Sequence, residues 1–113
     1  MSEVLIVGPD DHGLADRLAA AGVDAHRLDG RPVGADLEGG GIAGAGVFIV
    51  TDAGLASLIS VAKEHNPDVV VVLYGGGGLP DFAARQADLA IDPRLVDPDE
   101  VVDAVVDRLA TTT

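Results

Sequence analysis

Two glycines and an aspartate near the start of the chain are spaced as in a dinucleotide-binding site. Gly8 follows a short apolar segment, Gly13 begins the next, and Asp29 comes 21 residues after Gly8. In such sites the glycines let a pyrophosphate approach a helix N-terminus, and the acid binds the ribose hydroxyls. Asp10 replaces the middle glycine and places a negative charge near the phosphates. This departure favours the alternative that Gly8 and Gly13 shape a turn while Asp10 or Asp11 caps the helix.

Three aspartates could instead gather around a hard cation. Asp10 and Asp11 follow the first apolar segment, and Asp52 follows a later one after Thr51. Carboxylates from neighbouring loops are the usual protein ligands of Mg²⁺. Because 15 of the 19 acidic residues are aspartates, helix caps and an acidic surface explain these three better, and we expect no metal.

Other residue types offer weaker chemistry. Gly75 opens a run of four glycines that could present amides to an anion, although a flexible turn is the more common use of such a run. Tyr74 could stack on a base, but a half-buried tyrosine is more common at the end of a strand. The three histidines lack the spacing of metal ligands. No arrangement of nucleophile, base and oxyanion donors is recognisable, so we expect a non-catalytic protein.

Alternating strands and helices position these residues. Apolar segments bounded by turn residues predict strands over 4–7, 24–28, 47–50, 69–74 and 89–91. Apolar periodicity and terminal residues predict helices over 10–21, 52–66, 79–86 and 98–110, with Gly22 left-handed after the first. Residues 30–46 hold seven glycines and are predicted to form mostly loop, with one helical turn near residues 37–42.

This order predicts a three-layer α/β/α domain of Rossmann-like type. Right-handed crossovers give a five-stranded parallel sheet with strand order 2-1-3-4-5; an extra edge strand within residues 30–46 would give a dinucleotide-binding half-fold instead. Residues 1–110 are expected to form the single domain, and residues 111–113 a frayed tail. The carboxyl ends of the strands meet at one edge of the sheet, where a ligand would bind. The candidate binding residues there are Gly8, Asp10, Asp11, Gly13, Asp29, Thr51, Asp52 and Gly75.

Composition and charge indicate the environment and the kinds of partner to expect. The 19 acidic residues against 7 basic ones give a net charge of −12, with a single lysine. Molar salt shortens the Debye length to about 3 Å and screens such self-repulsion, so we expect a halophilic, cytoplasmic protein. Nucleic acid is excluded as a direct partner because no basic cluster exists. The chain has no cysteine, and no apolar segment or leader of the kind that inserts into a membrane or directs secretion is expected.

The third predicted strand and its helix resemble the TrkA-N type domain, a regulatory module of potassium transport systems. The resemblance rests on residues 45–52, on Ala62-Lys63, on Asn66-Pro67 and on residues 69–72. It implies binding of NAD(H) or an adenine nucleotide, with Asp29 on the ribose, and formation of a homodimer. The whole chain also resembles a small haloarchaeal family of unknown function. A CTP synthetase activity is not supported, because the chain lacks a Gly-x-x-x-x-Gly-Lys loop and a glutaminase cysteine.

A second resemblance is to the receiver domains of response regulators. Asp10-Asp11 after the first strand and Asp52 after the third are similar to their acidic cluster. Thr51 precedes the acceptor position, however, and Ile91-Asp92-Pro93 stands where receivers carry a lysine. The leading hypothesis is therefore a degenerate TrkA-N type module that binds a nucleotide. The alternative is a ligand-free interaction domain, derived from a Rossmann or receiver-like unit.

Overall fold

A parallel β-sheet forms the centre of the molecule. The computed structural model describes residues 4–8, 13–28, 42–52, 58–74, 87–91 and 96–111. Its strands are β1 (Val4–Val7), β2 (Ala25–Leu28), β3 (Val47–Val50), β4 (Val70–Tyr74) and β5 (Leu89–Ile91). They pair in parallel in the order β2-β1-β3-β4-β5. The predicted fold class and strand order are confirmed.

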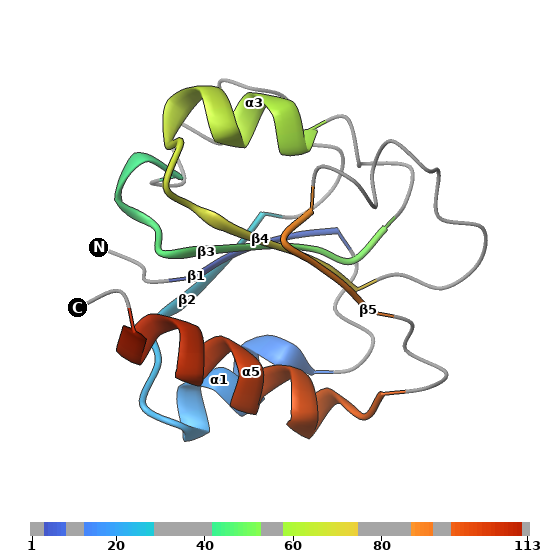
Figure 1. Cartoon of the computed structure of the whole chain (residues 1–113). Coiled ribbons are helices and arrows are strands. Elements are labelled where there is room, and N and C mark those ends of the chain that lie inside the picture. The colour runs from blue at the N-terminus through green and yellow to red at the C-terminus, as the bar shows by residue number, and fades with distance from the viewer. Residues whose placement is uncertain are drawn as a thin grey trace.

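Helices cover both faces of this sheet. Figure 1 shows α1 (Leu14–Ala20) and α5 (Pro98–Thr111) on one face and α3 (Leu58–His65) on the other. A short 3₁₀ turn, η1 (Ile42–Gly44), precedes β3 close to the predicted helical turn. The helix predicted over 79–86 lies outside the described residues, as does most of the segment 30–46. In the described part, none of the helices is long and apolar enough to cross a membrane.

The central strands are apolar on both faces because each face meets a helical layer. All residues of β1 and β3 are buried, and successive side chains point to opposite sides of the sheet. On the α3 side, Leu5 and Phe48 pack with Ile59. On the other side, Ile6 and Ile49 pack with residues of α1 and α5, namely Leu14, Leu18, Val101, Val102 and Val105.

At the ends of the helices, Gly22 and Pro98 take the predicted positions, whereas the start of α1 differs from its prediction. Gly22 adopts the predicted left-handed conformation after α1, with φ +83°. Pro98 is the first residue of α5, and the Asp97 carbonyl accepts hydrogen bonds from the amides of its first turn. The predicted aspartate N-cap of α1 is wrong. The N-cap is Gly13, which is left-handed and makes no side-chain hydrogen bond, so the helix begins at Leu14, later than an aspartate cap at residue 10 or 11 would place it.

Candidate functional site

The parallel register brings three of the predicted site residues together at the carboxyl edge of the sheet. Val7 is paired with Val50, so the residues that follow β1 and β3 are neighbours. Gly8 is buried, Thr51 is half-buried and Asp52 is exposed. A β-carbon built on Gly8 would lie 2.5 Å from Thr51 Oγ1 and 3.4 Å from the β-carbon of Asp52. Gly8, Thr51 and Asp52, which we call the edge cluster, therefore form one contact group.

Thr51 fills the space that Gly8 leaves open. The Val7 carbonyl accepts hydrogen bonds from the Thr51 amide at 3.0 Å and from its hydroxyl at 3.2 Å. Gly8 has a φ of +103°, a conformation that L side chains rarely adopt. The close approach that a glycine permits is thus used at this turn by a side chain of the same chain.

The remaining predicted site residues divide into two groups. Gly13 is the N-cap of α1, and a β-carbon there would meet nothing within 4 Å. Asp10, Asp11, Asp29 and Gly75 lie outside the described residues, so their ligand-binding roles stay predictions. Among the described residues, no three histidine, aspartate or glutamate side chains gather as they would around a metal ion.

Tyr74 is buried and is not positioned to stack on a base. Its side chain is 1% exposed and packs with the α1 and α5 side of the core. Its hydroxyl donates a hydrogen bond to the Val96 carbonyl at 3.1 Å. Burial, followed by the nearby charge of Asp97, raises the pKa of the phenol above 10.0. Both the base-stacking role and the half-buried position expected from the sequence are wrong, because α5 and its approach cover this end of β4.

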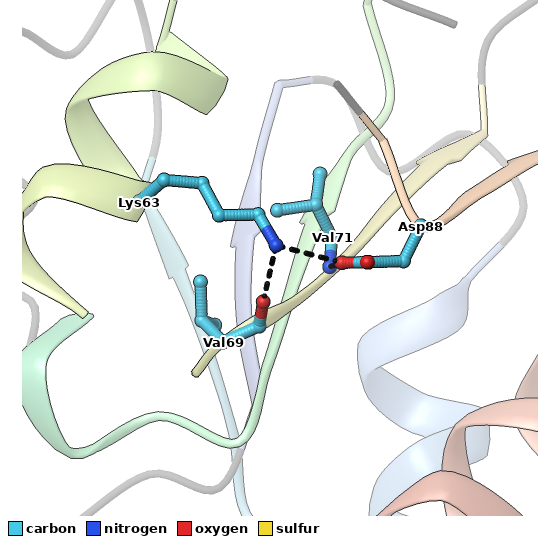
Figure 2. A network of polar contacts seen from close by, with 4 residues as sticks. All are labelled: Lys63, Val69, Val71 and Asp88. Atoms are coloured by element: carbon cyan, nitrogen blue, oxygen red, sulfur yellow. Dashed lines mark hydrogen bonds and ion pairs between the residues drawn. The ribbon is translucent and has the colours of Figure 1, made fainter. Parts of the chain in front are cut away.

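A polar network that sequence reasoning missed lies at the opposite edge of the sheet. Lys63 Nζ donates hydrogen bonds of 2.9 Å to the Val69 carbonyl and to Asp88 Oδ2. Asp88 Oδ2 also accepts one from the Val71 amide at 2.8 Å. Figure 2 shows Lys63 reaching from α3 to the segments that begin β4 and precede β5. The sequence offered one signal: Lys63 is the only lysine in the chain.

The network sets the charge state of Asp88. Burial favours a raised pKa, but the hydrogen bonds from the Val71 amide and Lys63, together with the lysine charge, outweigh it. The pKa of the Asp88 carboxyl therefore lies below its usual 3.8. The carboxylate is held ionised and ties α3, β4 and the start of β5 together.

A pocket of about 440 Å³ lies beside this network on α3. The described residues that line it are Ile59, Ser60, Lys63 and Glu64. The pocket shares no described residue with the edge cluster.

Residues 4–105 match the model of a family described as a family of unknown function, DUF7126. The chain belongs to this family. Among curated proteins, none matches its sequence.

Solved structures similar to this DUF7126 domain include response regulators. HP1043, an orphan response regulator of H. pylori, is 20% identical with a TM-score of 0.74, and the match covers 96% of this chain and 97% of the other. An atypical orphan response regulator is 22% identical with a TM-score of 0.73, covering 95% and 94%. These similarities show a shared fold.

A TrkA-N domain is also among the similar structures. The domain from the E. coli inner membrane protein ybaL is 13% identical with a TM-score of 0.68, covering 95% of this chain and 96% of the other. The DUF7126 chain thus has the Rossmann-like architecture that both predicted resemblances imply. The specific TrkA-N assignment goes beyond what this similarity shows.

Proposed function

We propose that the chain is a non-catalytic, receiver-like interaction domain that acts through its surface and needs no ligand at the carboxyl edge. The observation that carries the proposal is the packing of Thr51 against Gly8 and the Val7 carbonyl, because a side chain of the same chain occupies the space beside the turn that ends β1. The edge cluster then stabilises the ends of β1 and β3. In this proposal, the partner binds the outer surfaces of the domain.

The same packing argues against phosphorylation of a receiver type. The residue directly after β3 is Thr51, whose hydroxyl donates to the Val7 carbonyl, and the carboxylate that follows is exposed. One similar response regulator is described as having a phosphorylation-independent regulatory mechanism. We extend that mode to this chain: its partner recognises the folded domain regardless of phosphorylation.

A second candidate is a nucleotide-binding regulatory module. The similarity to a TrkA-N domain and the left-handed Gly8 turn at the end of β1 favour it. In this case Asp29, after β2, binds the ribose of NAD(H) or an adenine nucleotide, and the domain forms a homodimer.

A thermal-shift experiment in molar KCl separates the two candidates. NAD(H), ATP, ADP, AMP and CTP are each added with and without Mg²⁺; a ligand at 100 times its dissociation constant adds about 2.7 kcal/mol of stability. If the chain is an interaction domain, none of these nucleotides should change its melting temperature. A shift that Asp29→Ala abolishes, while the matched control Asp24→Ala retains it, would replace the interaction domain by the nucleotide module.

Partner binding is then measured directly. Proteins captured by the tagged chain from a native lysate in molar KCl are purified and bound again to the purified chain, and light scattering gives the mass of each complex. A saturable complex of fixed stoichiometry, or a homodimer, supports the interaction domain. A chain that stays monomeric and retains no purified partner overturns it.

A further inference from the structure

No further inference is drawn: the strongest candidate, the outer edge of the sheet along β5, where Ala90 is exposed and the strand carries no charged side chain, carries nothing because nothing in the described part of the chain shows what covers it.

Discussion

Of the three described glycines with positive φ, namely Gly8, Gly13 and Gly22, Gly8 is the one where an added side chain would meet its neighbours. An alanine there must adopt a left-handed conformation and displace the Thr51 hydroxyl from its bond with the Val7 carbonyl. We expect Gly8→Ala to lower the free energy of unfolding by about 2–4 kcal/mol, which combines backbone strain with a lost hydrogen bond. Denaturant unfolding in molar KCl measures the difference.

Two further variants separate strain from collision. Gly13→Ala is also left-handed, but its β-carbon meets nothing within 4 Å, so it should cost only about 1–2 kcal/mol. Thr51→Ala removes the hydroxyl that collides at Gly8, so the double variant should lose less stability than the sum of the two single ones. Strict additivity, or equal costs at Gly8 and Gly13, would show that the close approach is unimportant.

Tyr74 gives a stability change at alkaline pH. Burial first, and the Asp97 charge second, raise the pKa of the phenol above its ordinary value of 10.0. Because the folded pKa lies above the unfolded one, the stabilisation is complete below pH 10.0 and is lost as the pH rises through the folded pKa. It is the only tyrosine and there is no tryptophan, so ultraviolet absorbance reports its ionisation alone.

The matched variant is Tyr74→Phe. It removes the hydrogen bond to the Val96 carbonyl and should cost about 1 kcal/mol at neutral pH. Its unfolding free energy should lack the tyrosine-dependent decrease above pH 10.0. Parallel stability curves for the two proteins across this range would contradict the assigned environment of the phenol.

At the scale of the element, Asn66 joins the end of α3 to the turn before β3. Its side-chain amide donates hydrogen bonds of 3.1 Å to the Ile42 carbonyl and 2.7 Å to the Ala45 carbonyl. Asn66→Ala leaves both acceptors without this donor and should cost about 2 kcal/mol. Faster exchange of the Ala45 amide, which donates a hydrogen bond to the Ile42 carbonyl, would accompany the loss. The exposed Asp68→Ala serves as the control; equal stability of the two variants would remove this role.

The Lys63 network joins α3 to the two strands at the other end of the sheet. The folded pKa of Asp88 lies below its ordinary 3.8, so its stabilisation is present above that value and is lost as the pH falls through the folded pKa. Asp88→Asn should cost less than about 1 kcal/mol at neutral pH, because the ion pair is partly exposed. The difference from the unmodified protein should vanish in acid. A constant difference down to acid pH would contradict the ionised network.

Elements were predictable from the sequence where periodicity and burial agree, and side-chain contacts between elements were not. Continuous Val and Ile segments indicate strands covered on both faces, and β1 and β3 are buried throughout. The start of α1 was mistaken because aspartates suggested a cap that Gly13 provides. The Lys63 and Asp88 pair are 25 residues apart, and only the parallel register of β4 and β5 brings them together.

In the folded molecule, the residues of the sequence motifs make contacts that the motifs themselves do not indicate. Three features of the sequence each indicate a ligand: the glycine turn at Gly8, the predicted ribose-binding acid Asp29 and the cluster of aspartates that includes Asp52. The sheet brings the first turn against Thr51, so within the described residues the edge cluster is a packing contact. The pocket lies elsewhere, on α3. The described ends of β1 and β3 therefore form a packing contact at the place where the sequence predicts part of a ligand site.

Charge is the property of the whole chain that predicts its response to salt. With 19 acidic and 7 basic residues, like-charge repulsion dominates, and KCl should stabilise the fold by screening it. Screening weakens the exposed Arg17–Asp99 ion pair, but such pairs contribute little to stability.

We expect the free energy of unfolding to rise between about 0.1 M and about 2 M KCl. Because salt also strengthens apolar burial, the variant Asp103→Asn on the exposed face of α5 isolates the charge effect. It should be more stable than the unmodified protein in dilute buffer and should gain less from KCl. Parallel salt dependences would assign the stabilisation to apolar burial and remove the argument for a salt-adapted surface.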